Sequence, residues 1–288
     1  MDIDEYQRLS AETDQVSDGE NAIVVPLLGL AGETGTLLSS YKKRLRDGPA
    51  HEAFEANVAE DVGDVLWYLA NIATKLKLKL SDVAARNLVK TRGRFGSPTP
   101  GGRAFDDDAP DAERLPRVFE ITFEERTQDG KDVLLLFLDG QNVGDALTDN
   151  AYLPDGYRFH DAFHLAYATY LDWSPVTRFV LKRKRRSDPS KDEVEDGGRA
   201  RVFEEAIAAL AFDRARETGF FEGVERLDYD LLATARRLVA HQEVGVRSAA
   251  DWERAILEGF RIWRTLRTNN GGRVRYNRVL RTSEYLGH

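Results

Sequence analysis

Three carboxylates near the N-terminus have the types and spacing of metal ligands. Glu33 lies in the stretch LLGLAGETGTLLSSYKK, and Asp61 and Asp64 lie in AEDVGDVLWYLANIATK. At 100° per residue, each acid falls at the edge of an apolar helical sector roughly 120° wide. Two helices packed through these sectors bring the acids together, which is unfavourable unless a cation neutralises them. Mg²⁺ takes oxygen ligands and usually arrives with a phosphate substrate, whereas the alternative is a solvated acidic rim.

Glycines accompany these acids inside the same helical patterns. Gly32, Gly35 and Gly63 each cost about 1 kcal/mol relative to alanine in a helix interior. We therefore expect them to allow a close approach of the two helices or to leave room for a ligand.

The two stretches resemble a known family. GLAGETGTLL followed by EDVGDVLWYLANIA is similar to the MazG-type, all-α nucleoside triphosphate pyrophosphohydrolases, over about residues 20–95. Their pattern is Glu-x-x-Glu, a gap, and Glu-x-x-Asp. The resemblance implies that Glu33, Asp61 and Asp64 are catalytic residues that hold Mg²⁺, or Mn²⁺ in its place. Thr36 stands where the pattern has an acid, and Asp61 stands where it has Glu, so Thr36 leaves the strength of metal binding and catalysis open.

The same resemblance implies a substrate site for a nucleoside triphosphate. Asn87, Lys90 and Arg94 share one face of a helix that begins near residue 81, where they would hold the phosphates. Trp67 and Tyr68 are either contacts of the base or structural aromatics. The implied reaction is hydrolysis between the α and β phosphates to monophosphate and pyrophosphate, a housekeeping of the nucleotide pool. A surface stripe of basic residues is the simpler explanation of the helix face.

Composition bounds the class of protein. The 288 residues are 42% apolar and 31% charged, which is typical of one large or two ordinary globular domains. The net charge of −8 argues against a general nucleic-acid binder. The absence of cysteine excludes disulfides and thiolate ligands. No apolar run approaches the ~18 residues of a membrane span, and the acidic N-terminus lacks signal-peptide character, so we expect a cytoplasmic protein.

The sequence predicts a mainly α protein, with a MazG-like helical bundle followed by a second helical region that carries an inserted β-hairpin. We expect a MazG-like domain over residues 1–97, a Pro-, Gly- and Asp-rich linker over 98–117, and a C-terminal domain over 118–288. Strands at 118–124 and 133–138 form the hairpin around an Asp-Gly turn. The stretch 272–282 reads as a final strand or an extended tail.

The C-terminal half carries its own candidate cluster. His160 and His164 are four residues apart with Asp161 between them, and Glu204-Glu205 fall inside the following helix. Such residues bind transition metals, but buried, hydrogen-bonded histidines fit equally well. The basic run 182–186 and the acidic residues after it predict a solvated loop, with a phosphate-gathering loop as the alternative.

Three functional hypotheses remain open at this point. The first is the pyrophosphohydrolase. The second is a catalytically weakened nucleotide-binding or regulatory module, with the C-terminal half as effector or scaffold. The third places the chemistry at His160 and His164. The C-terminal half resembles the extension that accompanies some MazG-type domains, and it is also open to interpretation as a diverged second copy of the helical pair. A homodimer is compatible with each of these hypotheses.

Overall fold

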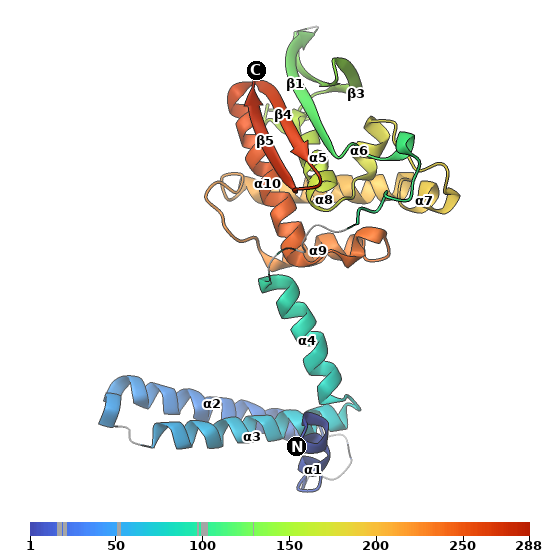
Figure 1. The fold of residues 1–288 in the computed structure, drawn as a ribbon. Coiled ribbons are helices and arrows are strands. Elements are labelled where there is room, and N and C mark those ends of the chain that lie inside the picture. The colour runs from blue at the N-terminus through green and yellow to red at the C-terminus, as the bar shows by residue number, and fades with distance from the viewer. Residues whose placement is uncertain (16–18, 20–21, 51–52, 97, 99–102, 129) are drawn as a thin grey trace. The chain divides into compact units, whose positions relative to one another are not determined.

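The structure is a computed structural model that describes residues 1–288 except 16–18, 20–21, 51–52, 97, 99–102 and 129 (Figure 1). The chain forms two compact units, Met1–Arg92 and Gly93–His288. The prediction of a mainly α protein is confirmed, although the second unit also contains a five-stranded sheet.

The first unit is built on two long helices that lie side by side (Figure 1). The helices that begin in this unit are α1 (Ile3–Ala11), α2 (Val24–Asp47), η1 (Gly48–Ala50), α3 (Phe54–Lys75) and α4 (Leu80–Phe95). A proline in the first turn is compatible with a helix start, and Pro26 occupies such a place in α2. Gly48 ends α2 at φ 60°, a conformation that favours glycine. The predicted acid-bearing helices are thus α2 and α3.

Polar contacts fasten α1 to the start of α4. The side-chain amide of Gln7 donates to the carbonyl of Leu78 and accepts from the amide of Leu80, both at 2.8 Å. Asp4 accepts hydrogen bonds from the backbone amide and the hydroxyl of Ser81, at 3.0 and 2.7 Å. These bonds satisfy amide groups that the first turn of α4 leaves unpaired.

The second unit combines an antiparallel sheet with a set of helices. Its elements are η2 (Asp111–Glu113), β1 (Val118–Gln128), β2 (Lys131–Leu138), β3 (Gln141–Leu147), η3 (Tyr157–Phe159), α5 (Asp161–Tyr170), α6 (Pro175–Val180), α7 (Pro189–Val194), α8 (Gly198–Arg216), α9 (Tyr229–Leu238), η4 (Glu243–Val246), α10 (Ala249–Asn269), β4 (Gly271–Asn277) and β5 (Thr282–Gly287). The strand order is β3-β2-β1-β4-β5. Helices α5 and α10 pack against β4 and β5 (Figure 1).

The predicted hairpin is confirmed, but it is part of a larger sheet rather than an isolated pair of strands. The predicted pair β1–β2 does form, with Phe123 opposite Leu136, but β3 extends it on one side and β4 on the other. Strand β4 pairs with β1 through residues more than 140 positions apart, such as Ile121 and Val274. A local alternation pattern carries no signal of such distant pairing. Of the two alternatives for residues 272–282, the strand is therefore confirmed, since most of β4 lies there and β4 is an interior strand of the sheet.

Helix α5 lies at the centre of the second unit. All of its residues, Asp161 to Tyr170, are buried. Small side chains let its neighbours approach, and a Cβ added at Gly259 of α10 would lie 3.3 Å from the Cβ of Ala166. In the part of the chain that the structure describes, no helix combines the length and apolar character that crossing a membrane requires.

The predicted linker belongs to the second unit in its described part, residues 103–117. Asp106 is fully buried, and its carboxylate accepts hydrogen bonds from the amide of Leu115 and the guanidinium of Arg178, both at 2.9 Å. Arg117 and Arg278 are also within ion-pair distance of Asp106. Burial acts to raise the pKa of this carboxyl, but the three guanidinium groups and the Leu115 amide outweigh it and lower the pKa to about 2. The Pro- and Gly-rich composition predicted a linker and gave no sign of the buried, ion-paired Asp106 within it.

The basic run 182–186 is also not a fully solvated loop. Arg185 is 1% exposed, and its guanidinium binds the carboxylates of Asp196 and Glu243 at distances of 2.6 to 3.1 Å. Arg178 also lies 3.5 Å from Asp196. Asp196 lies in the acidic stretch that follows the basic run, and the sequence predicts that this stretch is exposed to solvent.

We expect Asp106→Asn to lower the free energy of unfolding of the second unit by about 2–3 kcal/mol at neutral pH, because the ionised form is the one that the arginines bind. The pKa of Asp106 is lowered in the folded protein, so this contribution is complete above about pH 4 and is lost as the pH falls toward 2. The difference in unfolding free energy between the wild type and Asp106→Asn should therefore become smaller as the pH falls from about 4 to 2. Urea unfolding at several pH values, followed by tryptophan fluorescence in a Trp67→Phe background, measures it.

Asp111→Asn is the matched control. Its side chain is 94% exposed and pairs with Arg114 at the surface, so the change in unfolding free energy should stay within about 0.5 kcal/mol. Equal effects of the two substitutions would contradict the anchoring role of Asp106.

Candidate functional site

The three predicted acids of the first unit differ in burial. Asp61 is 7% exposed and accepts a hydrogen bond from the hydroxyl of Ser40 on α2 at 2.9 Å. Glu33 is half-buried and Asp64 is exposed. Thr36 is exposed, and its hydroxyl donates to the carbonyl of Gly32 in its own helix. In the described residues these acids do not form a group whose ligand atoms all lie within 4.8 Å of one another, so their metal site stays a prediction.

The two aromatic candidates of α3 have structural contacts. The indole nitrogen of Trp67 donates to the hydroxyl of Thr13 at 2.8 Å. The ring of Tyr68 packs against Gly29 of α2, where an added Cβ would lie 2.2 Å from the ring. A Cβ at Gly32, Gly35 or Gly63 would meet nothing within 4 Å, so close approach within the unit does not explain the glycines that the sequence singled out.

The predicted phosphate-binding residues lie along α4. Asn87 and Lys90 are exposed. Arg94 lies past the boundary between the units, and its guanidinium carbon is 4.8 Å from the ring centre of Tyr229 in the second unit. The structure therefore gives Arg94 a packing role that the spacing on one helix face did not indicate.

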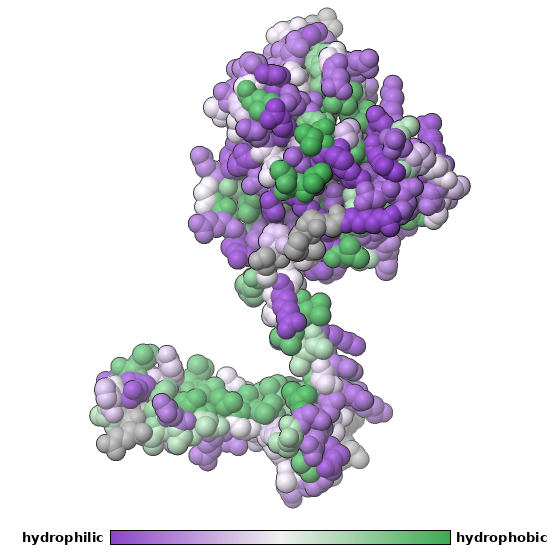
Figure 2. Space-filling view, in the orientation of Figure 1, coloured by the Kyte–Doolittle hydropathy of each residue, from purple (hydrophilic) through white to green (hydrophobic). Residues whose placement is uncertain are grey.

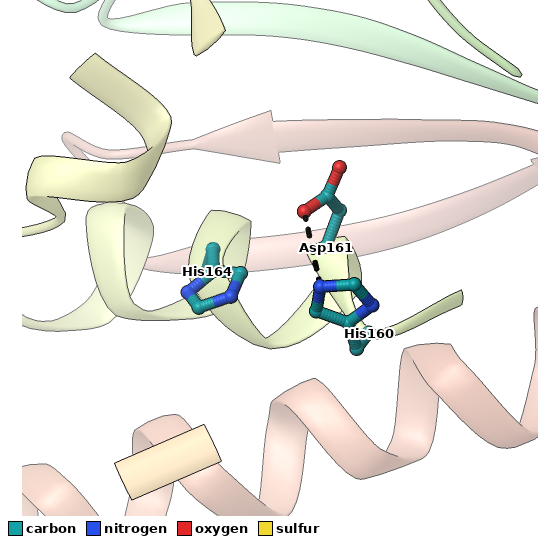
Figure 3. Close-up of side chains that lie close together, drawn as sticks. All are labelled: His160, Asp161 and His164. Carbon is teal, nitrogen blue, oxygen red and sulfur yellow. Dashed lines mark ion pairs between the residues drawn. The ribbon is translucent and has the colours of Figure 1, made fainter. Parts of the chain in front are cut away.

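The second unit brings together the histidine cluster at the start of α5 (Figure 3). The ring of His160 stacks on that of Tyr157, with centroids 4.5 Å apart and an interplanar angle of 4°. Its Nδ1 lies 2.9 Å from the carbonyl oxygen of Tyr157, and its Nε2 lies 3.9 Å from a carboxylate oxygen of Asp161. The turn before this stretch needs a glycine, since Gly156 has φ 85° and its carbonyl accepts a hydrogen bond from Trp263.

His164 lies one turn further along α5 and is held by α8. It is 1% exposed, and its Nδ1 lies 2.9 Å from Glu204 Oε1. Glu204 is fully buried, and it also accepts hydrogen bonds from the hydroxyl of Ser174 at 2.6 Å and the amide of Val176 at 2.8 Å. The other ring nitrogen, His164 Nε2, lies 3.3 Å from Glu205 Oε2 without hydrogen-bond geometry.

The two histidines have opposite pKa shifts. Burial lowers the pKa of His160. Burial acts in the same direction on His164, but the charge of Glu204 and the contacts with both glutamates outweigh it and raise its pKa well above the usual value. The pKa of Glu205 is lowered, because the interaction with His164 outweighs the effect of burial. Burial raises the pKa of Tyr157 to about 12.

An open cavity adjoins this cluster. Its volume is about 620 Å³, and His160, Asp161 and Glu205 line it together with Arg201. The guanidinium of Arg201 lies over the ring of Phe179, 4.1 Å from the ring centre. A ligand in the cavity would therefore meet imidazole, carboxylate and guanidinium groups at once.

Sequence reasoning named the histidines and the two glutamates but missed the residues that orient them. Ser174 begins α6, and its hydroxyl accepts a hydrogen bond from the amide of Thr177. The run Ser174-Pro175 has the form of a helix start, with serine as N-cap and proline at the first helical position. This signal could have located α6, but the pairing of Ser174 with Glu204 joins residues 30 positions apart.

The fold and these clusters define a mainly helical protein with potential metal ligands in both units. The family model of the MazG C-terminal domain matches residues 101–287, more than half of the chain, and the chain belongs to this family. A protein of Mycobacterium phage L5, named Gene 37 protein, is 33% identical over 101 residues, which are 33% of this chain and 89% of that protein. No solved structure matches the chain. The family match contains the histidine cluster and excludes α2 and α3.

We expect Gly29→Ala to loosen α2 from α3, because the new methyl group must displace the ring of Tyr68. Gly32→Ala, where nothing lies within 4 Å, is the control and should gain up to about 1 kcal/mol from the better helix propensity of alanine. Hydrogen exchange of peptides from α2 and α3 measures both. The amides of α2 and α3 should exchange faster in Gly29→Ala than in the wild type. Equal or slower exchange would show that the packing of Tyr68 against α2 does not require a glycine at position 29.

Proposed function

We propose that the chain is a metal-dependent nucleoside triphosphate pyrophosphohydrolase whose chemistry takes place on α2 and α3. Membership in the MazG C-terminal domain family supports a function of this kind at the level of the family. The finer assignment rests on the residues of the first unit, which have the types and order of the MazG-type motifs.

One observation carries this proposal. Asp61 is 7% exposed, and among the described residues its only hydrogen-bond partner is the neutral hydroxyl of Ser40. A buried carboxylate without a positive partner is costly, because it loses hydration that nothing replaces. A divalent cation shared with Glu33 and Asp64 removes this cost, and Ser40 would keep the carboxylate oriented toward it.

The residues of the chain then divide the reaction between them. Glu33, Asp61 and Asp64 would hold Mg²⁺ or Mn²⁺, and the ion would supply Lewis-acid activation of the phosphate and of the attacking water. Asn87 and Lys90 would bind phosphate oxygens and stabilise their negative charge, whereas Arg94 belongs to the second unit and packs on Tyr229. The packing of Tyr68 against Gly29 favours a structural role for Tyr68, so Trp67 is the better candidate for contact with the base.

A second function follows from Thr36. Its hydroxyl is bonded within its own helix and adds no charge to the acid group. With one carboxylate fewer than the family pattern, the first unit would bind nucleotide while turning it over slowly, and the second unit would act as effector or scaffold. Pyrophosphate release from a panel of nucleotides distinguishes a hydrolase from such a binding module.

A second copy of the chain is the partner that we propose for the first unit. Large apolar side chains are exposed along α2, including Leu28 at 68%, Leu38 at 67% and Leu45 at 75%. Figure 2 shows a hydrophobic surface along the α2–α3 pair. Contiguous exposed apolar surface of this kind marks an interaction site, and the helical pair offers a self-complementary face for a four-helix arrangement.

We expect Leu38→Glu to shift the protein from dimer to monomer in sedimentation velocity at micromolar concentration, because a carboxylate at this place would be buried without a partner. Leu280→Glu is the matched control, since Leu280 is equally exposed but lies in the turn between β4 and β5. A monomeric wild type, or a Leu38→Glu protein that stays dimeric, would contradict the proposed interface.

We expect Asp64→Asn to reduce the Mg²⁺-dependent release of pyrophosphate at least a hundredfold, because the amide keeps the shape and removes the charge that binds the metal. The exposed position of Asp64 predicts little change in thermal unfolding. Glu60→Gln, an exposed acid on the same helix, is the control and should retain activity. Wild-type turnover by Asp64→Asn would remove the acid cluster from the mechanism.

A further inference from the structure

We propose that the second unit holds a divalent transition-metal ion between the Nε2 atoms of His160 and His164 and the carboxylates of Asp161 and Glu205. This site goes beyond the proposed function, whose metal lies on the acids of the first unit. It is built from a different set of donors: His160, Asp161 and His164 lie at the start of α5 (Figure 3), and Glu205 lies on α8.

Both histidines present the same ring nitrogen to the site. His160 Nδ1 faces the carbonyl oxygen of Tyr157, and His164 Nδ1 faces a carboxylate oxygen of Glu204, each at 2.9 Å. These oxygens only accept, so each Nδ1 carries a proton, and Nε2 is the nitrogen available to a metal. Metal-binding histidines are held in this way, with the second nitrogen donating to a carbonyl or a carboxylate.

The donor atoms are already close together. The ligand atoms of His160, Asp161 and His164 all lie within 4.8 Å of one another. Ligands at about 2.0–2.2 Å from a tetrahedral metal lie roughly 3.2–3.6 Å apart, so a contraction of about 1 Å completes the set. Glu205 lies 3.3 Å from His164 Nε2, and its partly exposed side chain is free to adjust.

A second observation points independently to a ligand. His164 is 1% exposed, yet its Nε2 makes no hydrogen bond among the described residues. Glu205 Oε2 lies 3.3 Å away, within ion-pair distance but without hydrogen-bond geometry. A buried polar atom without a hydrogen bond costs about 1–3 kcal/mol, and native proteins rarely leave one without a reason. A metal ion at this place would satisfy the atom and balance the carboxylates around it.

The donor set and the cavity indicate the kind of metal and its surroundings. Imidazole nitrogen with carboxylate oxygen suits Zn²⁺, Mn²⁺, Fe²⁺ or Co²⁺, whereas Mg²⁺ prefers oxygen alone. Because His160, Asp161 and Glu205 line the open cavity, the ion would keep coordination positions for water or for an anionic ligand. Arg201 on the wall of the same cavity would attract such an anion. Open positions are typical of catalytic rather than structural metal sites.

The rival explanation makes His164 a structural cation. Its imidazolium form would pair with Glu204 and Glu205 and leave no place for a metal. The two explanations differ in what happens when a metal is offered, and Co²⁺ is the informative probe because its visible absorption reports nitrogen and oxygen ligands directly.

The experiment titrates Co²⁺ and Zn²⁺ into the full-length protein, without an affinity tag and after dialysis against a chelator. We carry out the titration in a Glu33→Gln/Asp61→Asn/Asp64→Asn background, so that the acids of the first unit cannot contribute. The expected result is one ion per chain, a Co²⁺ absorption band, and a thermal unfolding temperature that rises with Zn²⁺. The result is independent of nucleotide hydrolysis, so its failure and the failure of the proposed function are distinguishable.

Substitutions in the histidine cluster test whether the Co²⁺ ion binds there. His160→Gln and Glu205→Gln should each weaken Co²⁺ binding at least tenfold and change the absorption band, while circular dichroism shows the fold intact. His241→Gln is the matched control, because this histidine is exposed and lies outside the cluster. Absence of stoichiometric binding, or binding that His160→Gln and Glu205→Gln leave unchanged, would overturn the proposal and leave His164 as a structural cation.

Discussion

The hydrogen bonds to the buried carboxylate of Glu204 are the constraint that joins helices α5, α6 and α8 of the second unit. Glu204 is fully buried on α8 and receives hydrogen bonds from the first turn of α6, through Ser174 and Val176, and the ring nitrogen of His164 on α5. A buried charge is tolerated only when its oxygens are satisfied, so these three helices must meet at one place. Their meeting fixes the orientation of His164 and with it the geometry of the histidine cluster.

Much of the fold could be predicted from local patterns, and the exceptions share a physical cause. The 3.6-residue period located α2, α3 and α10, partial alternation located β1, and a short apolar run located β2. What could not be predicted are partners distant in sequence. The sequence predicts that Asp106 belongs to a linker, but in the structure it pairs with Arg178 and Arg278. It predicts that the run containing Arg185 is solvated, but Arg185 pairs with Asp196 and Glu243. Charged residues in turn-rich segments are ambiguous because burial is decided elsewhere in the chain.

For the candidate sites too, local patterns predicted the residues but not their burial or their distant partners. Periodicity placed Glu33, Asp61 and Asp64 along one edge of a helical pair, but it could not tell that Asp61 is buried while Asp64 is exposed. The spacing of His160 and His164 predicted either a metal-ligand pair or a buried pair, and the structure shows that both histidines are buried. Glu204 and the Tyr157 carbonyl contact the two Nδ1 atoms and thereby fix the orientation of both rings. The partners of these side chains, Ser40 for Asp61 and Glu204 for His164, lie 21 and 40 positions away in the sequence, and a local pattern does not indicate them.

We propose that the two units carry separate metal sites of different chemistry, with oxygen ligands in the first and mixed nitrogen and oxygen ligands in the second. The most direct measurement is an anomalous difference map from crystals of the full chain soaked with Mn²⁺ and a non-hydrolysable nucleoside triphosphate. We expect one peak beside Asp61 with the triphosphate and another between His160 and His164. A map in which His164 stays paired with Glu205 and no peak lies between the histidines would contradict this proposal.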